Sequence, residues 1–389
     1  MRVGFNYSVS YNRFGSEIGP DLWVADAEWD ARNQKETLGR VADIPLPPLF
    51  NFIDRNLANL SRMKVSVVRW FLLGHGNNYG PRPIPFLRVQ TGAPRSVAAA
   101  SRYPDYNFAP PAKLDARFRR DFVEMLTRFK NAGMQIIPSL ISFEFSSAQR
   151  FTTGPRTNTG AAGRADIIRD LGKQSTFLDT VLDELLQASI PFKDQIYAWE
   201  IVNEPVWMYL DIGANSYPRN WVQHVPEVAF NELKTFLENA VQRIDKAGFK
   251  STVGHRYYSD LSRLPSGTAP QFHYYADNST VRWVTSGLGY PADPGKIAGS
   301  QLFTGNPKPF VGEFGSDHNV GLARAWLSDF SSGDSTRARL ELLAKEGCDL
   351  ALIWPDRADS ATADPIKLQQ DTRKAIIDFT GGTLPPADQ

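Results

Sequence analysis

Two glutamates of this sequence close or lie within apolar runs and have the residue type for acid–base or nucleophilic chemistry. Glu204 ends a run that begins at Ile196, and Glu313 lies inside a run that begins at Phe310. Hydrolysis of a glycosidic bond needs two carboxyl groups, since one donates a proton to the leaving oxygen while the other attacks the anomeric carbon or activates water. The first hypothesis is therefore hydrolysis by a carboxylate pair.

Other polar and aromatic residues also lie at the ends of apolar runs or shortly after them. A single glutamate at such a place is more often a salt-bridge partner or a loop cap than a catalyst. Two glutamates accompanied by an arginine, a histidine and several aromatic residues are harder to explain in that way. The candidates for binding a substrate are Arg69, Glu144, Asn203, Trp207, His273, Tyr275 and Trp354, and His255 ends a further run.

The elements that would position these residues alternate between short β-rich apolar runs and longer segments of helical period. The expected strands are Val3–Val9, Val65–Leu73, Gln135–Phe145, Ile196–Val202, Ser251–His255, Gln271–Tyr275, Phe310–Phe314 and Leu350–Trp354. The expected helices are Leu49–Met63, Leu114–Ala132, Phe177–Gln187, Val228–Ala247, Thr336–Glu346 and Leu368–Phe379. This order predicts an α/β fold, a (β/α)8 TIM barrel with long βα loops that forms a single catalytic domain over residues 1–389.

A doubly wound open sheet is the alternative fold for the same alternation. The first expected βα turn, Ser8–Ser16, carries no G-x-G-x-x-G phosphate fingerprint, which argues against it. In a barrel, active groups gather at the carboxyl ends of the strands, where the candidate residues are expected to lie.

Composition excludes several classes of function. Lys and Arg number 43 and Asp and Glu 42, so the net charge of +1 gives no footprint for nucleic acid or an anionic membrane. Cys348 is the single cysteine, so no disulfide can form within the chain. With no apolar stretch long enough to span a bilayer and no signal peptide, we expect a cytoplasmic protein, or a secreted one whose signal peptide was removed.

Metal and cofactor chemistry has weak support in the sequence. The five histidines show no His-x-His pair or other short ligand spacing, so we expect no metal and no cofactor. These residues are His75, His224, His255, His273 and His318.

Several motifs resemble those of clan A glycoside hydrolases. Asn203-Glu204-Pro205 is similar to the Asn-Glu-Pro signature of the clan, and the segment 309–315 (PFVGEFG) is similar to its nucleophile strand. Further positions match the strand-six His-x-Tyr, the strand-two arginine and the strand-eight tryptophan; in that order they are His273 with Tyr275, Arg69 and Trp354. The resemblance follows the whole barrel order and is nearest to family five, the cellulase and mannanase family.

The resemblance implies a retaining mechanism through a covalent glycosyl-enzyme. Glu204 would be the acid/base, with a pKa raised by the nearby carboxylate, and Glu313 would be the nucleophile, held ionised by Arg69 and Tyr275. The two carboxyl groups are then expected about 5–5.5 Å apart. Asn203 would bind the sugar 2-hydroxyl.

The remaining substrate contacts are assigned on the same grounds. His273 would bind the sugar or orient Glu204, and Trp354 would form the floor of the subsite on the non-reducing side of the cut. Apart from the resemblance, we expect Trp207, or Trp23 and Trp29 of the first long loop, to lie further along the groove.

The sequence departs from the family at the end of the third strand, where many cellulase relatives carry a histidine and this chain has Glu144. Glu144 is either a substrate contact or structural. We expect a β-glucan or β-mannan type of substrate, with the sugar, the linkage and the oligomeric state left open. The alternatives are an exo-acting β-glycosidase on small glycosides, a non-catalytic carbohydrate-binding barrel and a metal-dependent hydrolase.

Overall fold

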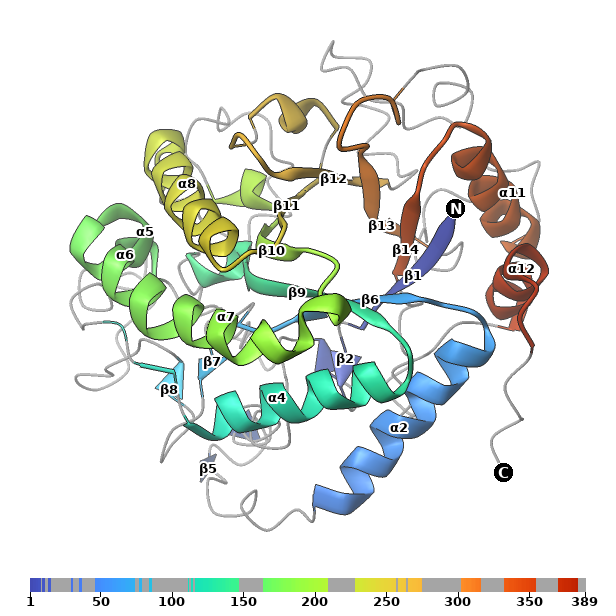
Figure 1. Ribbon diagram of the computed structural model, residues 1–389, viewed down its shortest axis with the longest axis horizontal. Helices are drawn as coiled ribbons and strands as arrows, with labels where there is room; N and C mark the ends of the chain where they lie inside the picture. Colours follow the sequence, from blue (N-terminus) through green and yellow to red (C-terminus); the bar gives the residue numbers. More distant parts are fainter. Residues whose placement is uncertain are drawn as a thin grey trace.

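Eight parallel strands form a closed barrel in the computed structural model of the protein (Figure 1). Around the barrel the order is β1-β14-β13-β12-β11-β10-β9-β6, so the first strand closes the ring against the last. This order confirms the predicted (β/α)8 barrel. The strands are β1 (Arg2–Asn6), β6 (Val67–Phe71), β9 (Gln135–Ser142), β10 (Trp199–Asn203), β11 (Ser251–His255), β12 (Ala269–Tyr274), β13 (Phe310–Gly315) and β14 (Leu350–Trp354).

The structure describes residues 1–7, 9–10, 13–14, 29–30, 35–36, 46–73, 77–78, 84–85, 111, 113–114, 116–146, 164–208, 228–256, 258–263, 265–274, 302–315, 332–354 and 370–383. Within these ranges, three pairs of two-residue strands form small antiparallel hairpins. They are β2 (Val9–Ser10) with β3 (Arg13–Phe14), β4 (Trp29–Asp30) with β5 (Lys35–Glu36), and β7 (Asn77–Asn78) with β8 (Ile84–Pro85).

Helices surround the barrel on the outside (Figure 1). None of the described helices is long and apolar enough to cross a membrane. The helices are α2 (Leu46–Arg62), α4 (Ala116–Asn131), α5 (Ala165–Arg169), α6 (Leu171–Phe177), α7 (Asp183–Ser189), α8 (Phe230–Lys246), α11 (Ser332–Lys345) and α12 (Gln370–Thr380).

Most predicted elements are present, with shifted ends. The predicted strand Gln135–Phe145 stops at Ser142 and continues as the 3-10 turn η3 (Phe143–Phe145). The predicted helix Phe177–Gln187 is one part of a longer run that begins at Leu171 and joins α6 to α7 through a π-helical turn, Leu178–Leu182. After β11 the chain forms the 3-10 helix η8 (Tyr258–Arg263), which is not among the expected helices.

The main core lies between the barrel and its helices, and α4 shows why. Phe118, Phe122 and Phe129 recur at helical spacing and are fully buried. The ring centroid of Phe122 lies 6.0 Å from that of Trp199 on β10, and the centroid of Phe129 lies 5.5 Å from that of Trp70 on β6. Burial of these aromatic faces fixes the helix against the outer side of the strands.

A second, smaller core fills the amino-terminal end of the barrel interior. It consists of Val67, Ile137, Phe310, Leu350 and Leu352. Alternate residues of a strand point the same way, so the residues two positions further along also face the interior.

The next interior layer is polar, because Arg69 follows Val67 and Ser139 follows Ile137 by two residues. Gly254 of β11 leaves the space for this layer. A Cβ atom at Gly254 would lie 2.8 Å from Oε2 of Glu200 and 3.2 Å from Nη2 of Arg69. The core thus supports a buried charged layer just below the mouth of the barrel.

Candidate active site

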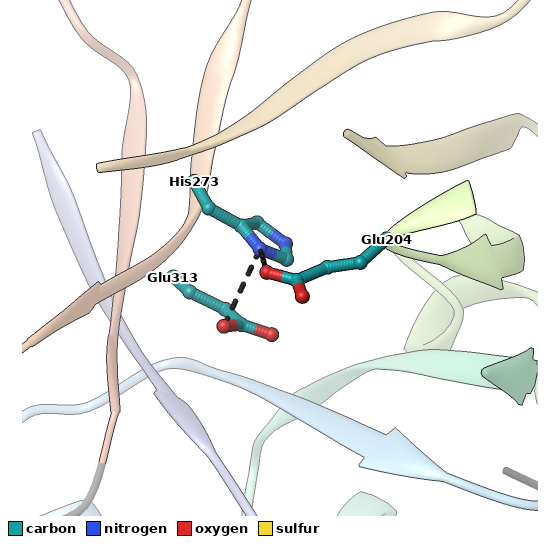
Figure 2. A group of neighbouring side chains, drawn as sticks. All are labelled: Glu204, His273 and Glu313. Atoms are coloured by element: carbon teal, nitrogen blue, oxygen red, sulfur yellow. Dashed lines mark hydrogen bonds and ion pairs between the residues drawn. The ribbon is translucent and has the colours of Figure 1, made fainter. Parts of the chain in front are cut away.

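Three side chains from different strands meet at the carboxyl-terminal mouth of the barrel. Glu204 directly follows β10, His273 lies on β12 and Glu313 lies on β13. Nδ1 of His273 lies 2.9 Å from Oε1 of Glu204 and 3.3 Å from Oε2 of Glu313. Figure 2 shows the imidazole ring reaching toward both carboxyl groups. The two glutamates singled out from the sequence are therefore brought together.

The backbone of Glu204 adopts an unusual conformation that aims its side chain. Its φ of 49° and ψ of 53° lie in the left-handed region, which a non-glycine residue seldom occupies. The amide N–H of Glu204 donates to the carbonyl oxygen of Gly254 at 2.7 Å, and the pairing of β10 with β11 shifts register between Glu200 and Asn203. Strain of this kind is found where a side chain has to be placed for function.

Arg69 holds the opposite glutamate from inside the barrel. Its Nη1 donates to Oε1 of Glu313 at 2.5 Å and to Oδ1 of Asn6 at 3.0 Å. Its Nη2 donates to Oδ1 of Asn203 at 2.7 Å. The predicted contact between Arg69 and Glu313 is therefore present, and it leaves Oε2 of Glu313 facing His273.

Glu200 is the second carboxylate on Arg69, and it is fully buried below the mouth. Nε and Nη2 of Arg69 donate to its two oxygens at 2.7 and 2.6 Å. Ser139 and Gln271 each donate a further hydrogen bond to Glu200 at 2.5 Å. Burial alone would lower the pKa of the Arg69 guanidinium, but the charges of Glu200 and Glu313 outweigh it and raise that pKa. Arg69 thus stays charged in the interior.

Glu204 has three donors around its carboxyl group. Arg256 Nη1 donates to Oε1 at 3.0 Å, and Trp207 Nε1 donates to Oε2 at 2.8 Å, while His273 faces Oε1. Burial would raise the pKa of Glu204, but Arg256, His273 and Trp207 together hold that pKa well below its usual range. The structure contradicts the predicted raised pKa of Glu204, because Arg256, His273 and Trp207 together outweigh the effect of burial.

Arg256 is a residue of the site that the sequence analysis missed. The polar residue expected at the end of the fifth strand was His255. Arg256 could have been found from the alternation of side chains along β11. Thr252 and Gly254 face the barrel interior, and Arg256 lies two residues further on, so it is expected to face the same side. His255 has the opposite phase and is buried, and burial lowers its pKa to about 3.

The other predicted contacts fall in different places around the site. Asn203 lies beside the glutamates, with Nδ2 3.3 Å from Oγ of Ser142 in addition to its contact with Arg69. Half-buried Trp354 packs edge-on against Phe71 with ring centroids 6.1 Å apart. The guanidinium carbon of Arg69 lies 4.5 Å from the centre of the Phe71 ring, so this aromatic pair borders the Glu313 side of the site.

Trp207 differs most from its predicted role as a sugar platform along the groove. Its indole N–H is bonded to Glu204, and its ring packs against Phe143 with centroids 6.3 Å apart. Four other predicted residues lie wholly or partly outside what the structure describes: Tyr275 and Trp23 altogether, and the side chains of Glu144 and Trp29.

The same cluster has the residue types of a small metal site. One ligand atom from each of Glu204, His273 and Glu313 lies within 4.8 Å of the others. However, Arg256 and Arg69 already donate to the two carboxylates, at 3.0 and 2.5 Å. Each carboxylate that would bind a cation already has an arginine charge beside it, and these two charges repel a divalent cation. The three side chains therefore fit internal ion pairs better than a metal site.

The separation of the two glutamates decides what this arrangement can do. Their nearest oxygens lie within 4.8 Å of each other. Inverting glycosidases keep their carboxyl groups roughly 6.5–9.5 Å apart to leave room for a water molecule, whereas retaining enzymes keep them about 5–5.5 Å apart. A nearest-oxygen distance below 4.8 Å favours the shorter of these two spacings, in which one carboxylate attacks directly.

Solved structures similar to this chain share its fold. A β-mannanase from the blue mussel Mytilus edulis has a TM-score of 0.58 and 14% identity over 98% of this chain and 92% of that chain. A β-1,4-mannanase from the sea hare Aplysia kurodai has a TM-score of 0.58 and 15% identity over 99% and 94%. A family 5 xyloglucanase from Paenibacillus pabuli has a TM-score of 0.51 and 12% identity over 97% and 98%.

These likenesses extend over nearly the whole of each chain and confirm the barrel architecture. The sequence itself matches no protein-family model, and a search of curated proteins found no match.

Proposed function

We propose that this protein is a retaining β-glycoside hydrolase of the clan A type, with Glu313 as nucleophile and Glu204 as acid/base. The observation that supports this most strongly is the pair of buried glutamates at the barrel mouth, with nearest oxygens within 4.8 Å and His273 between them. Arg69 on Glu313 adds to it, because the arginine fixes one oxygen of the proposed nucleophile and so orients its carboxyl group.

The reaction proceeds in two displacements. In the first, an oxygen of Glu313 forms a bond to the anomeric carbon while the glycosidic C–O bond breaks and Glu204, in its acid form, gives its proton to the departing oxygen. In the second, Glu204 as carboxylate takes a proton from water as that water attacks the same carbon and releases Glu313. In this proposal Asn203, which shares Arg69 with Glu313, binds the sugar 2-hydroxyl.

We infer a β-mannan or β-glucan type of substrate. The fold neighbours named as β-mannanases and a xyloglucanase support this, together with the motifs that resemble family five. The side chain of Trp354, half-buried at the end of β14, is available as a stacking surface for a pyranose ring.

A metal-dependent hydrolase is the second candidate, favoured by the cluster of Glu204, His273 and Glu313. The arginines on both carboxylates weigh against it. A carbohydrate-binding barrel without catalysis is the third, and it gives no reason for holding two glutamates at the retaining distance.

Activity and stereochemistry test the proposed function together. Purified protein is incubated with β-mannan, β-glucan, xyloglucan and aryl β-glycosides, with Glu313→Ala as the matched inactive control. Proton NMR then follows the anomeric configuration of the first product. We expect the β-anomer to form first; an α-anomer would contradict retention, and no turnover on any member of the panel would contradict the glycosidase assignment.

A further inference from the structure

The strongest unexplained feature of the site is the pair of contacts that hold Glu204 from its outer side. Arg256 Nη1 lies 3.0 Å from Oε1 of Glu204, and Trp207 Nε1 lies 2.8 Å from Oε2. The guanidinium carbon of Arg256 also lies 5.4 Å from the centre of the Trp207 ring. The arginine, the indole and the carboxyl group thus form a closed triangle, which we call the Glu204 clamp.

The clamp distinguishes Glu204 from Glu313, although both glutamates are buried and both face His273. Each carboxylate has its own arginine, from a different strand. Arg69 reaches Glu313 from the barrel interior and is fully buried, whereas the Arg256 side chain has 14% of its surface exposed at the mouth. Arg256 is therefore the arginine that a substrate entering the mouth can reach.

We propose that Arg256 is a positioning residue for the acid/base glutamate, and that the clamp it forms with Trp207 controls when Glu204 can act as an acid. This inference rests on the proposed function and assigns a role that the catalytic pair alone does not contain. Arg256 acts through Glu204 and takes no part in bond making.

The donors explain why the clamp favours one form of Glu204. Oε1 accepts a hydrogen bond from Arg256 and Oε2 accepts one from Trp207, so each oxygen already has a donor directed at it. A proton on either oxygen would have to compete with one of these donors. The clamp therefore favours the carboxylate form of Glu204, and the acid form gains when Arg256 moves away from Oε1.

Other charges also act on Glu204 within the described part of the chain. His273 from β12 shares Oε1, Glu313 from β13 lies within 4.8 Å through its nearest oxygen, and Arg69 from β6 neutralises Glu313 from behind. Because Arg69 compensates Glu313, the permanent charge of Arg256 dominates the balance at Glu204.

The test measures kcat/KM against pH on a β-linked oligosaccharide, whose sugar leaving group needs a proton. Arg256→Gln removes the charge, Arg256→Lys keeps a charge, and Trp207→Phe removes the indole donor. Arg337→Gln, in an exposed ion pair of α11, is the control. The reaction needs protonated Glu204, so activity falls as the pH rises through its pKa. Loss of an adjacent cation raises that pKa, so Arg256→Gln should shift this basic limb upward by about one pH unit or more.

We expect a smaller upward shift for Trp207→Phe and a limb near wild type for Arg256→Lys and Arg337→Gln. A purely structural role for Arg256 predicts a lower kcat with an unmoved limb, and that result would overturn the inference. Titration of the Glu204 carboxyl carbon by 13C NMR gives a second readout that needs no turnover, with Glu204→Gln to assign the signal. If the wild type has no activity, the proposed function fails, and an NMR midpoint unchanged in Arg256→Gln would separately refute the clamp.

Discussion

Arg69 donates from Nη1 to Oε1 of Glu313 at 2.5 Å, and both side chains are buried at the end of the barrel interior. This contact fixes one oxygen of Glu313 and leaves the other directed at the space beside His273. A carboxyl group held in this way is oriented before a substrate arrives, and the proposed nucleophilic attack on an anomeric carbon needs that orientation.

The two glutamates should respond in opposite ways to an external nucleophile. Glu313→Ala should abolish turnover of all substrates, and azide attacking the sugar directly should give a product of inverted configuration. Glu204→Ala should lose activity mainly on poor leaving groups, and azide should restore turnover with retained configuration because it attacks the covalent intermediate. Kinetics with aryl β-glycosides and NMR of the azide products measure both effects. The reverse pattern of configurations would exchange the two roles.

Glu200 should contribute strongly to the free energy of unfolding, although it is buried below the mouth of the barrel. Glu200→Ala leaves Arg69 buried with one carboxylate fewer, and breaking such a pair costs roughly 3–5 kcal/mol of unfolding free energy. Denaturant unfolding monitored by circular dichroism measures this loss. Glu184→Ala is the control, because Glu184 is 54% exposed and forms a surface ion pair of a type worth about 0–1 kcal/mol. Equal losses in the two variants would contradict the role given to the buried pair.

His255 should make the protein less stable at mildly acidic pH. Its ring is buried, and desolvation, with a smaller effect from the charges of His273 and Arg263, lowers its pKa from 6.5 to about 3. Below pH 6.5 the unfolded chain takes up a proton that the folded protein does not, so stability is lost as the pH falls toward 3. A single group of this kind contributes about 1.4 kcal/mol per pH unit.

His255→Asn should remove this part of the pH dependence. Urea unfolding between pH 4 and pH 7 gives the slope of the unfolding free energy for both proteins. The slope is the readout, because the substitution also changes packing at every pH. An unchanged slope would show that His255 is protonated in the folded protein.

Chelation should leave the reaction unaffected. The two arginines on Glu204 and Glu313 already satisfy the carboxylates that a metal would need. Dialysis against EDTA should therefore preserve kcat/KM on the best substrate of the panel, and metal analysis of the dialysed protein provides the control. Loss of activity on dialysis, with recovery on adding a divalent cation, would favour the metal-dependent reading instead.

Much of the fold could be predicted from the sequence, because the spacing of apolar residues and the limits of each run indicate the helices and strands. The predicted ranges of β11 and β14 agree with the structure residue for residue; β14 is a short apolar run, and β11 is a short run that contains the β-branched residues Thr252 and Val253. Helix α4 was placed to within two residues at its start because its phenylalanines recur on one face. The π-helical turn after Phe177 has no comparable signal, because the apolar pattern continues through it.

The meeting of the two glutamates at the barrel mouth was predictable from motifs, whereas the electrostatics of the pair were not. Glu204 and Glu313 follow from their place at strand ends, but the pKa of Glu204 depends on a contact with Arg256 across the barrel mouth. A sequence shows that both residues exist and does not show that they touch. The alternation of side chains along β11 predicts that Arg256 lies at the mouth, but its distance from Glu204 depends on how the strands are arranged in three dimensions.

Closure of the barrel between β1 and β14 also determines when the site can exist during synthesis. Arg69 and Glu313 are separated by 244 residues, which a ribosome adds in about 10–50 s at 5–20 residues per second. Arg69 and Glu200 emerge much earlier and can pair, but neither Glu313 nor the carbonyl groups that hold Asn6 are yet made. A nascent chain therefore carries an unfinished ring with two exposed strand edges for most of its translation, and it should depend on chaperones until the last strand is released.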